Sequence, residues 1–102
     1  MVKRFQIWLV SLETSATNSR PCVIVSPDEI SNNLEYVTIA PITSEVRNYP
    51  TRVSLQLFGS EKFIAVDQLQ TIEKEQLTKL IGEIDENEES RLLETLQEIF
   101  AK

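Results

Sequence analysis

Apolar residues in the first part of the chain form short runs separated by polar segments and prolines. Residues 5–12 (FQIWLVSL) are apolar at both odd and even positions, as a strand covered on both faces is. Residues 22–26 (CVIVS) are rich in β-branched side chains, which favour buried strands. Alternating or short apolar runs follow at residues 36–42, 52–58 and 63–66. The pattern therefore predicts a series of short β-strands over these segments.

Polar and proline-containing segments predict the connections between these strands. Residues 13–19 (ETSATNS) are small or polar throughout, and we expect them to form a loop. Residues 26–29 (SPDE) favour a turn or the first turn of a short helix, and residues 32–33 (NN) are expected to be loop again. Residues 59–62 (GSEK) are expected to form a further turn. Because no repeat or linker divides the sequence, we expect a single domain over residues 1–102.

The stretch of residues 36–50 (YVTIAPITSEVRNYP) changes character halfway along. Its first part alternates as a strand does and then reaches Pro41, which lacks a backbone donor and tends to end or bulge a ladder. Two hydroxyl groups, on Thr43 and Ser44, follow at once, together with a charged pair and a second proline. We therefore expect a core strand whose end bends outward and presents hydroxyl groups.

The carboxyl-terminal part contains one ambiguous segment and one clear helix. Residues 72–84 fit the spacing of a helix and the alternation of a strand equally well. Asp85 and Glu88 then have the spacing of a capping box, and an apolar stripe from Leu92 to Phe100 marks an otherwise charged helix. Short strands and one terminal helix together predict a mostly β fold, a small and strongly bent sheet or barrel with the helix packed on it.

The net charge of −6 argues against a broad surface for nucleic acid. The charge is uneven, however. Residues 1–60 carry five basic and five acidic side chains, whereas residues 61–102 carry five basic and eleven acidic ones. Because no basic field is available to steer a polyanion, any contact with RNA has to be local.

The sequence favours a cytoplasmic protein without a membrane contact. A single cysteine, Cys22, excludes an internal disulfide. No apolar run approaches the roughly 20 residues that span a bilayer. The apolar start after Lys3 and Arg4 is short and lacks a small-residue cleavage site, so we interpret it as a strand and not as a signal peptide.

Histidine is absent from the chain, which excludes His-dependent acid–base catalysis and removes the commonest ligand of transition metals. Cys22 lies within an apolar run and is interpreted as a core residue. Arg20 stands between a polar loop and a buried strand. It is either a surface residue paired with Glu13 or a guanidinium group aimed at a phosphate.

The other polar side chains at strand ends allow two interpretations as well. Thr43 and Ser44 either cap backbone groups or donate hydrogen bonds to phosphate oxygens. Asp67 and Gln68 directly follow an apolar run, and they either satisfy a turn or read the edges of bases. From the residues alone, both alternatives stay open.

The order of these segments resembles the MazF/PemK family of toxins. The resemblance rests on IWLVSL, RPCVIVSPDE, VTIAPITS, RNYPTRV and VDQLQTIEKEQL, followed by the leucine-rich helix. It implies a small SH3-like β-barrel with a carboxyl-terminal helix, working as a homodimer. It also implies a short helical turn near residues 73–76 and a strand from about Thr78, which resolves the ambiguous segment.

The family includes sequence-specific endoribonucleases that cut single-stranded RNA without a metal or other cofactor and are held in check by an antitoxin protein. By resemblance, Arg20 contacts the scissile phosphate and Thr43 assists it. The implied reaction is attack by the RNA 2′-hydroxyl, which leaves a 2′,3′-cyclic phosphate and a 5′-hydroxyl end. Asp67 is expected to contact RNA and, in one branch of the family, to act as general base. The further substrate-contact candidates are Asn18, Ser19, Ser44, Arg47 and Gln68.

Several positions depart from the pattern of the family. Phe5 and Gln6 stand where a glycine and an acidic residue are frequent, and the first loop is short and has no glycine. Ala65 and Gln70 occupy positions where arginine occurs in other members. Two alternatives therefore remain: a catalytically weak or inactive binding module on the same barrel, or a gyrase-poisoning toxin of the CcdB type.

Overall fold

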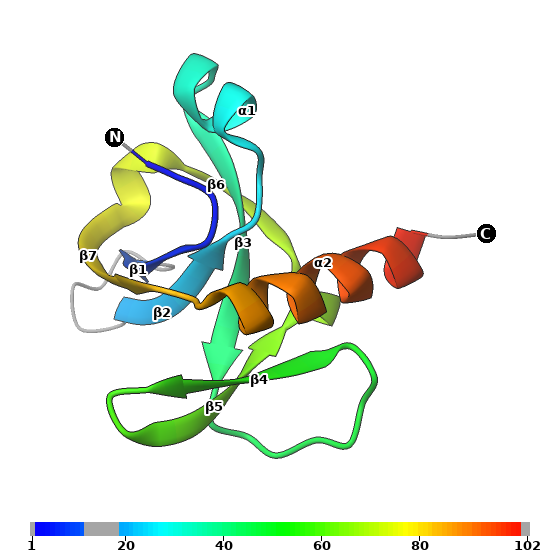
Figure 1. The fold of residues 1–102 in the computed structure, drawn as a ribbon. Coiled ribbons are helices and arrows are strands. Elements are labelled where there is room, and N and C mark those ends of the chain that lie inside the picture. The colour runs from blue at the N-terminus through cyan, green and yellow to red at the C-terminus, as the bar shows by residue number, and fades with distance from the viewer. Residues whose placement is uncertain (1, 12–18, 101–102) are drawn as a thin grey trace.

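The computed structural model describes residues 2–11 and 19–100, and Figure 1 shows a strongly curled sheet crossed by a long helix. The helical elements are α1 (Asp28–Asn33), α2 (Glu86–Phe100) and the short 3₁₀ helices η1 (Val66–Gln68) and η2 (Lys74–Gln76). The strands are β1 (Gln6–Ser11), β2 (Ser19–Ile24), β3 (Tyr36–Thr43), β4 (Arg52–Leu57), β5 (Ser60–Ala65), β6 (Gln70–Glu73) and β7 (Leu77–Glu83). The mostly β fold with a terminal helix is thereby confirmed, with the sheet curled into a half-barrel.

Strand β3 is the centre of the sheet, whose strands follow the order β4-β5-β3-β2-β1-β7, with β6 also paired to β3. All recorded pairings are antiparallel. The pairing of β3 with β2 ends where Cys22 lies opposite Pro41, and β3 then pairs through Ile42 and Thr43 with β5. Pro41 therefore lies inside β3, at the residue where the pairing with β2 ends. The lack of a backbone N–H removes the fewest ladder hydrogen bonds at such a position.

The apolar side chains divide into two clusters on opposite faces of the central strands. Val23 and Val25 face the first cluster, which includes Leu92 of α2, while Cys22 and Ile24 face the second. Successive side chains of a strand point to opposite faces. A strand with apolar neighbours on both faces therefore has the continuous apolar run seen in this sequence.

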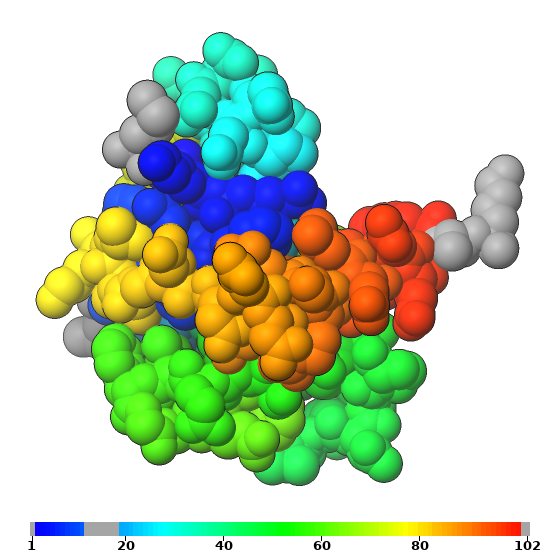
Figure 2. Space-filling view, in the orientation of Figure 1, coloured from blue at the N-terminus to red at the C-terminus, as the bar shows by residue number. Residues whose placement is uncertain are grey.

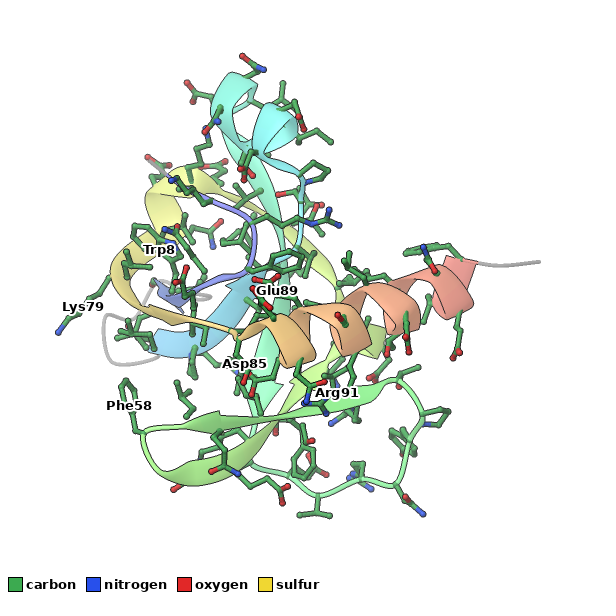
Figure 3. The ribbon with its side chains drawn as sticks, viewed as in Figure 1. Trp8, Phe58, Lys79, Asp85, Glu89 and Arg91 are labelled. Carbon is green, nitrogen blue, oxygen red and sulfur yellow. The ribbon has the colours of Figure 1, made fainter. Side chains whose placement is uncertain are left out.

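Side-chain hydrogen bonds join helix α2 to the edge strand β4. As the sequence predicts, its capping box is present: Asp85 N donates to Glu88 Oε1 (2.9 Å), and Glu88 N donates to Asp85 Oδ1 (2.7 Å). Glu88 Oε2 also accepts from Gln56 N (3.2 Å). Arg91, which extends from α2 toward β4 in Figure 3, donates to the Ser54 hydroxyl and carbonyl oxygens (3.0 Å each). These bonds occupy backbone groups that an edge strand would otherwise leave open.

The apolar stripe of α2 is confirmed except at its end. Leu92 is fully buried, and Leu96 and Ile99 pack against the first cluster. Phe100, in contrast, is mostly exposed, because it lies beyond the last strand that the helix covers. Figure 2 shows α2 lying across this face of the molecule, between the amino-terminal segments and the β4–β5 hairpin.

Two predicted connections were wrong in detail, and one strand was missed. Residues 32–33 belong to α1 and not to a loop. Residues 60–62 belong to β5, because the hairpin needs only a two-residue turn at Phe58 (φ 51°) and Gly59 (φ 80°). Strand β6 was not predicted at all. Its ladder to β3 forms although Ile72 is its only buried side chain, so it has little apolar signal. The helical turn and following strand that the resemblance implied are confirmed as η2 and β7.

Phe5 has a backbone conformation that favours glycine, the residue that the family resemblance leads us to expect at this position. Its φ is 74°, in the left-handed region that side chains other than glycine rarely adopt. Its N–H donates to Ile24 O (2.8 Å), its carbonyl accepts from Ile84 N (3.1 Å), and its ring packs against the first cluster. Packing and two backbone hydrogen bonds hold this strained residue in place.

In the part of the chain that is described, no helix combines the length and apolar character that crossing a membrane requires.

Candidate functional site

Arg20 and Thr43 lie at the same end of two paired strands. Arg20 is the second residue of β2 and lies opposite Val10, whereas Thr43 is the last residue of β3 and lies opposite Phe63. The recorded pairing of β2 with β3 is antiparallel and ends with Cys22 opposite Pro41. The start of β2, with Arg20, and the end of β3, with Thr43, therefore lie at the same end of the sheet.

The positive charge of Arg20 is close to Cys22. Burial raises the pKa of the Cys22 thiol to about 12, and the Arg20 charge only partly opposes this. The thiol donates to the Arg20 carbonyl oxygen (3.6 Å) and stays protonated at neutral pH, which fits a core residue and not a nucleophile.

Arg20 itself is half-buried. Among the described residues, no hydrogen bond or ion pair of its guanidinium is recorded. Glu13, its partner in the alternative interpretation, and Asn18 lie outside the described residues, while Ser19 is exposed at the start of β2.

Thr43 has the capping role that the sequence allows, and its donation to a phosphate stays a prediction. Its hydroxyl oxygen accepts a hydrogen bond from Glu45 N (3.0 Å), which turns the chain out of the sheet. The hydroxyl proton remains available, since a threonine can accept and donate at once. Ser44 and Arg47 are exposed in the loop of residues 44–50, where Arg47 forms an ion pair with Glu45. A solvent-exposed pair of this kind contributes little stability.

Asp67 has a structural role that the sequence did not reveal. Its Oδ1 accepts from Arg52 Nε (2.9 Å) and from the Thr51 hydroxyl (3.0 Å), and its Oδ2 accepts from Arg52 Nη2 (3.3 Å). The hydrogen bond from Arg52 is the main cause that lowers the pKa of the Asp67 carboxyl. The Arg52 side chain is only 6% exposed, and its ion pair with Asp67 connects the start of β4 to η1.

Asp67 and Gln68 are placed on the other side of β3 from Arg20. They follow β5, which runs antiparallel to β3, so the chain leaving Ala65 moves away from the Thr43 end. Asp67 is engaged by Arg52, whereas Gln68 is exposed. The strand pairings thus place Arg20 and Thr43 at one end of the sheet and Asp67 and Gln68 farther along it, and the roles of all four in binding RNA stay predictions.

Sequence reasoning missed Thr51, Arg52 and Tyr49 as members of this region. The Arg52 guanidinium lies over the Tyr49 ring, 5.4 Å from its centroid. The only sequence signal was their place in the RNYPTRV segment, where an arginine opens a strand. Its partner is 15 residues away in the chain, and only the pairing of Arg52 with Ala65 brings the two together.

The described pockets lie away from Arg20 and Thr43. One, of about 450 Å³, lies between the end of α1 and η2, and Glu35, Glu73 and Glu75 are among its lining residues. The Glu75 carboxylate is the main cause that raises the pKa of Glu73. Within residues 2–11 and 19–100, no group of three or more Cys, Asp or Glu side chains is arranged to hold a metal ion. Neither of the two described pockets is lined by Arg20 or Thr43.

The small curled half-barrel with a carboxyl-terminal helix is a fold that this chain shares with MazF toxins. The chain belongs to the PemK-like, MazF-like toxins of type II toxin–antitoxin systems, because the family's sequence model matches residues 3–100. No curated protein matches the chain.

Solved structures agree with this family. The chain is similar to the Mycobacterium tuberculosis toxin MazF-mt6, with a TM-score of 0.81 and 28% identity over 93% of this chain and 95% of that one. A mycobacterial endoribonuclease in complex with its cognate antitoxin has a TM-score of 0.85 and 20% identity, covering 96% and 93% of the two chains. A Deinococcus radiodurans MazE-MazF structure has a TM-score of 0.83 and 15% identity, covering 98% and 95%. At these lower identities the likeness concerns the fold alone.

Proposed function

We propose that this protein is the toxin of a type II toxin–antitoxin module and acts as a sequence-specific, metal-independent endoribonuclease on single-stranded mRNA. Membership of the toxin family supports the first part. The similarity of the fold to a protein described as an endoribonuclease in complex with its antitoxin supports the second. Growth inhibition in the cytoplasm is the expected consequence.

The observation that carries the proposal is the shared position of Arg20 and Thr43 at the ends of β2 and β3. A guanidinium group binds phosphate oxygens with several donors in a fixed plane, and a hydroxyl adds a neutral donor beside it. Donors placed where charge develops on a phosphorane lower the barrier more than they stabilise the bound substrate.

The proposed step uses the nucleophile of the substrate. The RNA 2′-oxygen forms a bond to the adjacent phosphorus, the bond from phosphorus to the 5′-oxygen breaks, and no water is consumed. The 2′-hydroxyl loses a proton and the leaving 5′-oxygen gains one. Arg20 neutralises charge on the non-bridging oxygens, and Thr43 donates to one of them.

Asp67 is not assigned as the base in this step. Its carboxylate accepts hydrogen bonds from Arg52 and Thr51, and its pKa is lowered, so it is a weak proton acceptor. The 2′-hydroxyl instead gives its proton to water, and the leaving 5′-oxygen takes one from water. This leaves positioning and charge stabilisation as the main contributions of the protein.

The proposed partners follow from the same comparisons. A similar mycobacterial structure contains a cognate antitoxin, so we propose an antitoxin that covers the site of this chain. A homodimer, as the family resemblance implies, would place two copies of the site on one assembly.

The cleavage test is incubation of the purified protein with long single-stranded RNA in EDTA, followed by mapping of the new ends. Fragments with 5′-hydroxyl ends are expected. Arg20→Ala should lower the rate by roughly 10³-fold or more, and Thr43→Val by roughly 10²-fold, from the loss of a preorganised donor. Thr43→Ser keeps the hydroxyl and should restore most of the activity.

Lys79→Ala is the matched control, because Lys79 projects from β7 away from the body of the molecule in Figure 3. It removes one positive charge without touching the candidate site and should leave the rate unchanged. A wild-type protein that binds RNA but cleaves no sequence would favour the inactive binding module. Cleavage abolished by EDTA would contradict metal independence.

A further inference from the structure

Tyr49 is held in a defined orientation at the end of the exposed loop of residues 44–50. The Arg52 guanidinium lies over its ring at 5.4 Å from the centroid, and Arg52 N donates to the Tyr49 carbonyl oxygen (3.1 Å). The residue is nevertheless 50% exposed. Arg52 thus approaches one side of the ring, while half of the residue's surface remains open to solvent.

The arginine that holds this ring is itself fixed. Its bonds to Asp67 at 2.9 and 3.3 Å form a two-pronged pair, and Thr51 adds a third hydrogen bond to the same carboxylate. Val66 N also donates to the Thr51 carbonyl oxygen (3.1 Å). An aromatic ring that is ordered before binding loses less conformational entropy when a ligand stacks on it.

The charges around the ring cancel one another. Glu45 pairs with Arg47, and Asp67 pairs with Arg52, so the loop offers no surplus positive charge to a phosphate backbone. Stacking on a nucleobase needs no such charge, because every base has an aromatic face. The net charge of −6 repels the phosphate backbone of RNA, and a stacked base provides a contact that does not depend on attraction between charges.

Other exposed aromatic side chains lack this arrangement. Tyr36 is equally exposed at the start of β3, Phe58 occupies the hairpin turn, and Phe100 ends α2. The other recorded cation–π pair of the described residues joins Arg4 to Phe5, whose ring packs against the apolar core. Among the described residues, Tyr49 alone combines an open ring with a fixed guanidinium.

We propose that Tyr49 is a substrate-binding residue that stacks on an unpaired base of single-stranded RNA, with Arg52 and Asp67 as its positioning residues. The inference rests on the proposed function, since it names a contact for the same RNA. It places this contact six residues after Thr43 in the loop that leaves the candidate site. A base of the bound strand would thereby be recognised by stacking and not by charge.

The test measures binding separately from cleavage. A single-stranded RNA containing the mapped cleavage site carries a 2′-O-methyl group at the cleaved nucleotide, so that it binds without reacting. Fluorescence anisotropy gives its Kd for the wild type and for Tyr49→Ala, Tyr49→Phe and Tyr36→Ala. Tyr49→Ala should weaken binding by roughly 5- to 150-fold, the range for losing one stacked base. Tyr49→Phe, which keeps the ring, and Tyr36→Ala should stay within about twofold of the wild type.

A second readout identifies the base that stacks. 2-Aminopurine placed at successive positions of the same RNA should be quenched at one position by the wild type and by Tyr49→Phe, and not by Tyr49→Ala. Circular dichroism checks that each variant is folded. Asp67→Asn, which weakens the support of Arg52, should reduce the quenching at that position.

The outcomes separate this inference from the proposed function. If the wild type neither binds nor cleaves any RNA, both are wrong. If it binds and cleaves normally while Tyr49→Ala has wild-type affinity and wild-type quenching, the stacking role alone is wrong. Unchanged RNA affinity together with a weakened complex with the antitoxin would assign Tyr49 to a protein interface and equally overturn the proposal.

Discussion

Replacing Asp67 by alanine is expected to destabilise the folded protein by about 2–3 kcal/mol. The carboxylate accepts two hydrogen bonds from Arg52 and one from Thr51, and bonds to charged groups each contribute about 1.5–3 kcal/mol. Breaking a fully buried pair costs about 3–5 kcal/mol, because one charge is left without a partner. Here the Arg52 side chain is 6% exposed but the Asp67 side chain is 32% exposed. Water therefore replaces part of the lost interaction, and the expected destabilisation is smaller than for a fully buried pair.

The assay is equilibrium unfolding in urea of Asp67→Ala, Arg52→Gln and the double variant. The double-mutant cycle should give a coupling energy of about 1–2 kcal/mol between the two residues. Glu61→Ala is the matched control, since this exposed carboxylate on β5 has no recorded ion pair and its loss should change stability by less than about 0.5 kcal/mol. An Asp67→Ala variant as stable as Glu61→Ala, or a coupling below about 0.5 kcal/mol, would refute the structural role and leave Asp67 free to contact RNA.

The same pair predicts a pH dependence with a definite sign. The pKa of Asp67 is lower in the folded protein than in the unfolded chain, where it is near its ordinary value of about 3.9. Its contribution to stability is therefore fully present above that unfolded value and is lost as the pH falls through the lower, folded value. The difference in unfolding free energy between the wild type and Asp67→Asn should be constant from about pH 7 to pH 5 and shrink below about pH 4. A difference that grows in acid would contradict the assignment.

Two further predictions concern the scaffold. Glu88→Ala should cost about 2–3 kcal/mol in urea unfolding, because Asp85 N and Gln56 N both lose an acceptor, whereas Glu86→Ala in the same helical turn should cost less than about 1 kcal/mol from the helix dipole alone. Equal losses would show that the buried carboxylate does not fasten α2 to β4. Phe58→Asn should raise stability by about 0.5–1 kcal/mol, since asparagine tolerates the left-handed φ of 51° in a two-residue hairpin turn. An unchanged or lower unfolding midpoint would show that the exposed ring contributes contacts that outweigh its backbone strain.

Much of the fold was predictable because side-chain alternation is a local property. The run at residues 22–26 indicated a buried strand, and Val23 and Cys22 indeed face separate apolar clusters. Asp85 and Glu88 indicated the start of α2, since a capping box involves only neighbouring residues. Strand β6 gave no such signal, because its existence depends on a backbone ladder to β3 and not on its own side chains.

The departures from the family pattern acquire a physical meaning only in the structure. Phe5 keeps the left-handed backbone that favours glycine, and the apolar cluster receives its ring. Gln6 accepts hydrogen bonds from Lys3 N (2.8 Å) and Trp8 Nε1 (3.0 Å) through one oxygen, a role that an acidic residue could also perform. Both positions therefore concern the scaffold.

Ala65 stands where some relatives carry an arginine near the aspartate. It is fully buried here and lies directly opposite Arg52 on the neighbouring strand. The cation that pairs with Asp67 comes from β4.

By itself, the sequence determined most of the strands and the terminal helix, because side-chain periodicity and capping are local properties. The phosphate-binding roles of Arg20 and Thr43 came from the resemblance to a family and not from the residues alone. Tertiary structure alone decided which polar residues meet, because strand register sets distances between residues far apart in the chain. It joined Asp67 to Arg52 and so to the ring of Tyr49.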